Sequence, residues 1–183
     1  MKKNQEFLSL MQRYVVNISI AGSTLRNQGA KGVAEAARIF LAEQLDLSKL
    51  RTIQPSIYPD ILSEWTYNLQ QELPEGAKNW GTARKAINVF MVQVFLNKYL
   101  AEEYGMEKLK DVLETPLDSY AAGTLRRLAG RGRLPRWKGI IGLKKEDSDK
   151  YQEFASQVAT ENKLSRACLD IILWRPKNGE ELK

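Results

Sequence analysis

The amino-acid sequence predicts an all-α fold, and three observations lead to this class. Apolar residues recur at helical spacing along most of the 183 residues. Convincing runs of alternating apolar and polar residues, which are typical of half-buried β-strands, are absent from the sequence. Several glycine and proline residues stand between the helical segments, where they mark turns. We therefore expect several short helices rather than a bundle of long ones.

The first half of the chain is expected to contain four helices separated by turns. Residues 23–32, "STLRNQGAKG", interrupt the apolar pattern after the first helix, and Pro55 lies in a linker before the third. Asp60 is a candidate cap for the third helix. Residues 74–81, "PEGAKNWG", form a turn before the fourth helix, which Gly105 ends. The expected helices cover about residues 4–22, 33–45, 58–73 and 80–103.

The second half is expected to contain shorter helices and a basic connector. Asp118, in "PLDS", stands where the N-cap of a helix belongs. Residues 130–143, "GRGRLPRWKGIIGL", are basic and rich in glycine, which predicts a connector. The expected helical segments cover about residues 106–114, 115–129, 146–161 and 164–174. The second of these includes the residues that lead to the capping Asp118. The length fits one domain, and two lobes would comprise residues 23–105, with the turn, and residues 1–22 together with 106–183.

The composition narrows the chemistry that the chain can perform. The chain has no histidine and one cysteine, Cys168. This excludes Ser-His-Asp and Cys-His hydrolases, most zinc sites built from protein ligands, and four-cysteine iron–sulfur clusters. Any catalysis must therefore rest on lysine, carboxylate, tyrosine or hydroxyl side chains.

The charge of the chain favours a polyanionic partner. The net charge is +6 and the pI is about 9.4. Nucleic acid is the first candidate and an anionic membrane surface the second, while a merely basic protein is the alternative. No apolar run is long enough to span a bilayer, and the N-terminus does not resemble a secretory signal. We expect a cytoplasmic protein, associated with the nucleoid if the source is a prokaryote.

Lys85 is the first candidate for a catalytic role. It lies near the start of the helix that begins in "NWGTARKAINVF" and outside the apolar face of that helix. The positive end of the helix and the neighbouring Arg84 disfavour the charged amine and are expected to lower its pKa, and burial would lower it further. A neutral lysine amine can attack a sugar C1′ or a carbonyl carbon and form a Schiff base. The alternative is a solvated surface charge, which is the commoner role of a lysine.

Asp118 is the second candidate. As an N-cap it would contribute about 1 kcal/mol of stability, which is a purely structural role. A carboxylate at a helix N-terminus is also stabilised in its ionised form. It can therefore stabilise a cationic sugar transition state or accept a proton, and the two roles are compatible.

Two further features are typical of contact with a polyanion. The turn of residues 74–81 can present backbone N–H groups to a phosphate at the start of the following helix. Basic residues surround Trp137, a combination that suits contact with a nucleic-acid backbone and stacking on one base. A solvated connector is the alternative. The basic residues are Arg126, Arg127, Arg131, Arg133, Arg136 and Lys138.

The order of these motifs resembles that of the helix-hairpin-helix DNA glycosylase superfamily, the endonuclease III type. "GTARKAINVF" is similar to the family's hairpin and lysine segment, and "TPLDSYAAGTLRRL" to its aspartate segment. "VVNISIAGSTLRNQGAKGVAEAARIF" is similar to its early helix–loop–helix, so the resemblance covers about residues 14–128. The long separation of Lys85 and Asp118 is similar to that in the archaeal 8-oxoguanine glycosylase branch, whereas the turn is longer than the usual hairpin.

The resemblance implies a two-lobed helical fold and a monomeric enzyme that excises a damaged base, such as 8-oxoguanine, from double-stranded DNA and then nicks the strand. Lys85 matches the catalytic lysine and Asp118 the catalytic aspartate, and neither a metal nor an organic cofactor nor a membrane is implied. Leu25 or Arg26 would fill the gap left by the flipped base. The other expected DNA contacts are Gly76, Lys78, Gly81, Thr82, Arg84, Arg126 and Arg127. The candidate base stackers are Trp65, Trp80, Tyr120 and Trp174.

Two other functions are compatible with the sequence. A non-catalytic DNA-binding module of the same fold would use Lys85 as a phosphate contact. A helical interaction protein without DNA affinity would carry its basic charge incidentally. A salt-dependent binding titration on duplex DNA separates this last function from the other two.

Overall fold

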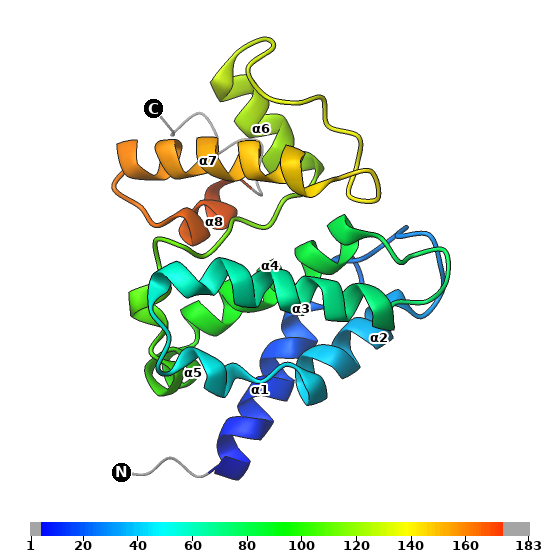
Figure 1. Ribbon diagram of the computed structural model, residues 1–183, viewed down its shortest axis with the longest axis vertical. Coiled ribbons are helices and arrows are strands. Elements are labelled where there is room, and N and C mark those ends of the chain that lie inside the picture. The colour runs from blue at the N-terminus through cyan, green and yellow to red at the C-terminus, as the bar shows by residue number, and fades with distance from the viewer. Residues whose placement is uncertain (1–4, 174–183) are drawn as a thin grey trace.

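The structure is an all-helical chain whose helices gather in two groups (Figure 1). It is a computed structural model that describes residues 5–173, and no β-strand occurs in that range. The first group contains α1 (Gln5–Ser19), α2 (Val33–Ile39), α3 (Tyr58–Glu72), α4 (Trp80–Leu96) and α5 (Lys98–Tyr104). The second contains α6 (Ser119–Ala129), α7 (Lys145–Glu161) and α8 (Leu169–Leu173). The expected all-α class is confirmed.

Short segments of other helical types connect these helices. A π-helical segment, η1, extends α2, because the backbone N–H of Leu45 bonds to the carbonyl oxygen of Phe40. Four 3₁₀ segments lie in the connections between longer helices. The bounds are η1 (Phe40–Gln44), η2 (Leu47–Leu50), η3 (Pro55–Ile57), η4 (Met106–Leu109) and η5 (Arg166–Cys168).

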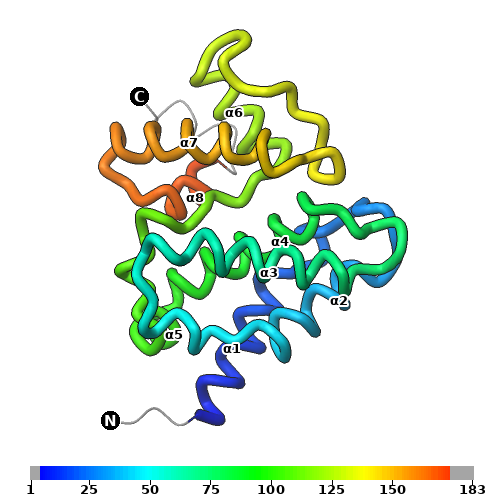
Figure 2. The backbone as a smooth tube through the Cα atoms, viewed as in Figure 1, coloured from blue at the N-terminus to red at the C-terminus, as the bar shows by residue number. Residues whose placement is uncertain are grey.

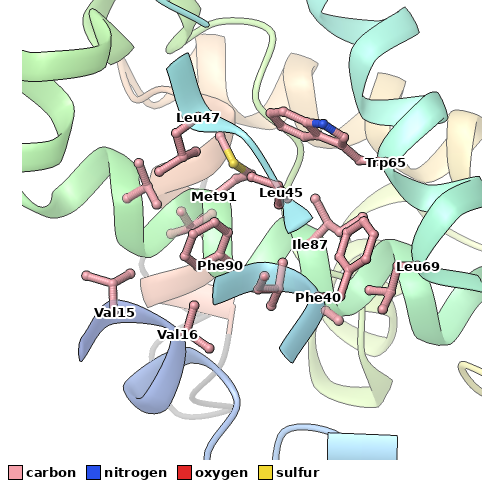
Figure 3. Packing of buried hydrophobic residues seen from close by; sticks show 14 of the residues in the cluster. Val15, Val16, Phe40, Leu45, Leu47, Trp65, Leu69, Ile87, Phe90 and Met91 are labelled. Carbon is pink, nitrogen blue, oxygen red and sulfur yellow. The ribbon is translucent and has the colours of Figure 1, made fainter. Parts of the chain in front are cut away.

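The first group packs around α4, which contacts α1, α3 and α5. Ile87 and Phe90 of α4 are fully buried, and polar residues of the same helix are buried beside them. A helix that is enclosed on nearly all sides belongs at the centre of a core. Figure 3 shows Val16 of α1, Phe40 of η1 and Trp65 of α3 in this core. α4 is therefore the central element on which the first group is assembled.

The second group has its own apolar cluster, formed by α6, α7 and α8 and lying above the first group in Figure 1. The chain passes from one cluster to the other between Leu113, which packs in the first cluster, and Leu117, which packs in the second. Leu8 and its neighbours on α1 pack in the first cluster. The packing therefore does not follow the expected grouping of residues 1–22 with 106–183, since α1 joins α4.

The helix expected over residues 80–103 is interrupted at Asn97. The backbone of Asn97 is extended, with φ −85° and ψ 110°. Its side-chain Oδ1 accepts hydrogen bonds of 3.1 Å from the backbone N–H groups of Tyr99 and Leu100, so Asn97 caps a new helix, α5. Gly105 ends α5 with φ 64°, a left-handed conformation that glycine adopts without strain.

Asp60 does not cap α3. The N-cap position is Ile57, which provides no side-chain hydrogen bond. Asp60 lies within the first turn of α3, after Pro59, where its negative charge is favourable near the positive end of the helix. Asp60 therefore stabilises α3 through its charge and not, as expected, through a capping hydrogen bond.

Candidate functional site

A cleft of about 1040 Å³ opens between the two groups of helices and contains Lys85, Asp118 and Asp170. Lys85 comes from α4 in the first group, whereas the two carboxylates come from the N-cap of α6 and from α8 in the second. The tube in Figure 2 shows how far apart along the chain these segments lie. The apolar part of the wall is formed by Ile18, Val89, Pro116, Tyr120 and Ile171. Two carboxylates of the second group of helices thus line the same cleft as an amine of the first group.

A second hollow of about 360 Å³ adjoins the cleft and shares Lys85 and Asp118 with it. Its other walls come from the loop that contains Arg26 and from the connector that contains Lys138. Both of these cations are exposed. The amine and the carboxylate therefore lie where a ligand can approach between two positively charged side chains.

Lys85 is half-buried, and burial is the largest influence on its charge. Burial lowers the pKa of Lys85, while the negative charges of Asp118 and Asp170 raise it, and the balance is a pKa below the ordinary value. Among residues 5–173, no carboxylate oxygen comes within 4.0 Å of its Nζ. Of the causes expected from the sequence, burial is confirmed as the largest, and Arg84 is not among the influences on this pKa. The amine is thus more easily deprotonated than a surface lysine.

Asp118 caps α6, as expected from the sequence. Its Oδ1 accepts hydrogen bonds from the backbone N–H groups of Tyr120 at 2.8 Å and of Ala121 at 2.9 Å. Within the described part of the chain, its Oδ2 makes no hydrogen bond. One oxygen of the carboxylate is therefore fixed by the helix, and the other is available to a ligand in the cleft.

Asp170 belongs to the cleft although the sequence did not identify it. Burial, followed by the negative charge of Asp118, raises the pKa of Asp170 to about 6, and Lys85 opposes this increase. Asp170 lies in the apolar run "CLDIILW", which was expected only to form a helix. An acidic residue inside an apolar run is the signal that could have identified it.

The side chains of Thr82 and Arg84, which were expected to contact DNA, are buried. The hydroxyl of Thr82 donates a 2.9 Å hydrogen bond to Oε1 of Gln28, and its backbone N–H is bound by Asn79. The Arg84 side chain lies 3.3 Å from a carboxylate oxygen of Glu114 and covers the ring of Trp80 at 4.9 Å. These contacts correct the expectation for Thr82 and Arg84, because both side chains already have partners inside the protein.

The glycines of the turn have packing roles. A Cβ on Gly81 would lie 2.0 Å from the carbonyl oxygen of Ile140, so Gly81 allows the connector to approach α4. This replaces the expected phosphate contact at Gly81. Gly76 is exposed, with φ +85°, and its carbonyl oxygen would lie 2.4 Å from a Cβ on Gly29. Lys78 is also exposed and pairs with Glu75 at 3.5 Å.

Of the two residues expected to fill the gap in the DNA, only Arg26 is accessible. Leu25 is buried in the first cluster, which corrects its expected exposure. Arg26 is exposed and lines both the cleft and the adjoining hollow. A side chain that is to fill a gap in DNA must be accessible, so Arg26 is the candidate on this loop.

The four candidate stackers differ in their positions. Trp65 is part of the first core, which excludes it as a base stacker. Trp80 is half-buried against the second cluster, beneath Arg84. Tyr120 is 55% exposed and lines the cleft, so it alone among the three described aromatic residues is free to stack on a ligand there. Trp174 lies outside the described residues.

The basic residues of α6 and the connector remain on the surface. Trp137 is half-buried instead, with its ring edge against Tyr151 at a centroid distance of 5.9 Å and its Nε1 3.4 Å from Ser119 Oγ. Its packing role replaces the expected stacking on a base. The exposed cations are Arg126, Arg127, Arg131, Arg133, Arg136 and Lys138.

Residues 5–173 contain no group of three or more His, Cys, Asp or Glu side chains that could hold a metal ion. None of the helices in that range has the length and apolar character needed to cross a bilayer.

No protein-family model matches the chain, and neither a curated protein nor a solved structure matches it.

Proposed function

We propose that the chain is a DNA glycosylase with an associated lyase step, in which Lys85 is the nucleophile and Asp118 assists it. The observation that carries this proposal is the meeting of a lysine of lowered pKa with Asp118 in a cleft between two helical groups. The sequence resemblance places a catalytic lysine and aspartate at these two positions. The fold proposed with this function is the two-lobed helix-hairpin-helix glycosylase type.

The proposed reaction begins with the neutral amine of Lys85. Its Nζ attacks C1′ of the damaged nucleotide, the N–C1′ bond forms, and the bond from C1′ to the base breaks. The base leaves with the bonding electrons and takes up a proton, and the sugar ring opens to a Schiff base. Loss of a C2′ proton then breaks the C3′–O bond and nicks the strand. Water finally releases Lys85 from the sugar fragment.

Asp118 and the cleft walls support the individual steps. The free oxygen of Asp118 can stabilise positive charge on the sugar and accept a proton from the attacking amine. Tyr120, Ile18 and Ile171 offer aromatic and apolar surface against which an extruded base can pack. Arg26 and Lys138 bring positive charge to the adjoining hollow, where phosphates would lie.

Trapping of the Schiff base tests the proposal. Sodium borohydride reduces such an intermediate to a stable amine, so the wild-type protein should become covalently attached to lesion-containing DNA. We expect Lys85→Gln to abolish the adduct. Lys49→Gln is the matched control, because Lys49 is exposed in η2 and does not line the cleft; it should trap like the wild type.

The substrate panel decides between the proposal and its rivals. Duplexes that each carry one damaged base, including 8-oxoguanine, should contain at least one that gives the adduct. Salt-dependent DNA binding without an adduct on any duplex would instead identify a non-catalytic DNA-binding module. A wild-type protein that binds none of the duplexes would instead favour a helical interaction protein without DNA affinity.

A further inference from the structure

The chain crosses between the two clusters through a short buried segment. Leu113 belongs to the first cluster and Leu117 to the second. Thr115, between them, is fully buried. Asp118 follows directly, so the position of this carboxylate relative to α4 depends on how residues 112–116 are held.

Gln152 of α7 holds the crossing segment from the second cluster. Its carboxamide oxygen accepts a 3.0 Å hydrogen bond from the backbone N–H of Thr115, and its Nε2 donates a 2.8 Å bond to the carbonyl oxygen of the same residue. Gln152 is itself buried. One side chain thus satisfies both backbone groups of Thr115, and because it lies away from water no solvent molecule replaces it at low cost.

Arg166 adds a second connection from the same side. Its Nε and Nη2 donate 2.8 Å hydrogen bonds to the carbonyl oxygens of Leu113 and Val112. The hydroxyl of Thr115 donates a 2.6 Å bond to the carbonyl oxygen of Arg166. Because Asp170 follows shortly after Arg166, these bonds connect the second carboxylate of the cleft to the crossing segment.

Glu114 holds the crossing segment against the first cluster. Its Oε2 accepts a 2.8 Å hydrogen bond from Nδ2 of Asn88 and lies 3.3 Å from Nε of Arg84. Asn88 and Arg84 are on α4, on either side of Lys85 in the sequence. Glu114 therefore binds the crossing segment to α4, the helix that carries Lys85. Gln152 and Arg166 bind it to the second group of helices, which carries Asp118 and Asp170.

We propose that Gln152 is a positioning residue, which holds the crossing segment from the side opposite Glu114 and thereby sets Lys85 against Asp118. The catalytic consequence rests on the proposed function, whereas the effect on geometry does not. Gln152 does not line the cleft, so it acts through the backbone of residues 112–118. A misplacement of about 1 Å between reacting groups can lower a rate by about 100-fold, so such a connection has a measurable effect.

The deciding measurement is the pKa of Lys85 in Gln152→Leu, which removes both hydrogen bonds to Thr115. Reductive methylation with ¹³C-formaldehyde gives an NMR signal that can be titrated without DNA and assigned by its loss in Lys85→Arg. Lys85 is surrounded by Asp118, Asp170, Arg26 and Lys138, and burial is the largest influence on it. We expect its pKa to rise toward the ordinary value as the two groups separate and water enters.

Two controls keep the test decisive. Gln157→Leu makes the same substitution at an exposed position of α7 and should leave the pKa unchanged. If Gln152→Leu does not fold, Gln152→Asn keeps a buried amide that is too short for both bonds and is titrated in its place. A Lys85 pKa equal to that of the wild type in the folded variant overturns the inference.

The excision rate separates this inference from the proposed function. In single turnovers we expect the folded Gln152 variant to be at least about tenfold slower, with a DNA Kd within about threefold of the wild type. A wild type that never forms an adduct with DNA contradicts the glycosylase proposal and leaves the pKa measurement valid. An active wild type and an unchanged Lys85 pKa in the variant contradict the positioning role alone.

Discussion

At the scale of single residues, the cleft contains one amine, Lys85, and two carboxylates that differ in how the protein holds them. Asp118 is fixed by the first turn of α6, whereas the side chain of Asp170 makes no hydrogen bond or ion pair with the described residues. Burial lowers the pKa of Lys85 and raises that of Asp170, so both groups are shifted toward their neutral forms. Residues with such perturbed pKa values are typical of functional sites.

Asp118→Asn separates the capping role from the chemical one. Asparagine is as good an N-cap as aspartate, so the free energy of unfolding should change by less than about 0.5 kcal/mol. The excision rate should fall by about 100-fold or more, because the negative charge is lost. Thermal unfolding and single-turnover excision check the two parts. Asp118→Ala should in addition lose about 1 kcal/mol of stability. A rate in Asp118→Asn that matches the wild type would leave Asp118 as a cap only.

Asp170 should make the stability of the protein depend on pH. Its pKa is about 6 in the folded state and about 3.9 in an unfolded chain. Between about pH 4 and 6 the folded state therefore binds the proton more tightly, and stability falls as the pH rises through this window.

Asp170→Asn should remove that dependence. We expect it to be about 1–2 kcal/mol more stable than the wild type at pH 7 and equal to it near pH 4, with partial solvent exposure reducing the effect. Thermal unfolding of both proteins over this pH range provides the comparison. A stability difference that is the same at all pH values would contradict the assignment of the raised pKa to Asp170.

At the scale of elements, the connector is seated on the start of α4 through Gly81. Gly81→Ala would place a Cβ 2.0 Å from the carbonyl oxygen of Ile140, and backbone atoms cannot move as easily as a flexible side chain. We expect a loss of about 2 kcal/mol or more in the free energy of unfolding, measured by urea denaturation.

Gly123→Ala is the matched control for this substitution. Gly123 lies inside α6, and no atom would lie within 4 Å of the new Cβ. It should gain up to about 1 kcal/mol, because alanine favours the helix. If Gly81→Ala is as stable as the control, the close packing of the connector on α4 is incorrect.

The helices themselves were largely predictable, because their signals are local. The apolar spacing, Gly105 and the cap at Asp118 each act within a few residues, and all three are present in the structure. The break at Asn97 was missed because the surrounding residues favour a helix on both sides. The capping role of Asn97 is recognised only in the structure, from the hydrogen bonds that its side chain accepts from the following backbone N–H groups.

The roles of individual side chains were less predictable, because their partners are distant in the chain. Thr82 is bound by Gln28, and Arg84 by Glu114, and no local pattern indicates either pairing. The burial of Leu25 likewise results from packing in the first cluster. Local sequence thus identified Lys85 and Asp118 as candidates, whereas only the folded chain brings Asp170 to them.

At the scale of the whole molecule, the positive charge of α6 and the connector should bind the DNA backbone. Arg126 and Arg127 are exposed at the end of α6. Replacing both with glutamine should reduce the slope of log K against log salt by about two, because each phosphate contact releases about one counterion. Fluorescence anisotropy at several salt concentrations measures the slope.

Lys49→Gln combined with Lys110→Gln is the control for this loss of two charges. Lys49 and Lys110 belong to the first group of helices and already pair with Glu64 and Glu107, at 3.0 and 2.8 Å. The salt slope of this control should remain that of the wild type. Equal slopes for both double variants would show that charge alone, rather than this surface, determines binding.

The measurement that tests the nucleophile most directly is the location of the reduced DNA adduct. After borohydride treatment and proteolysis, mass spectrometry should find the sugar fragment on the peptide that contains Lys85, and only there. An adduct on another lysine or on the N-terminal amine, with Lys85 unmodified, would contradict the central claim that the half-buried amine of the cleft performs the reaction.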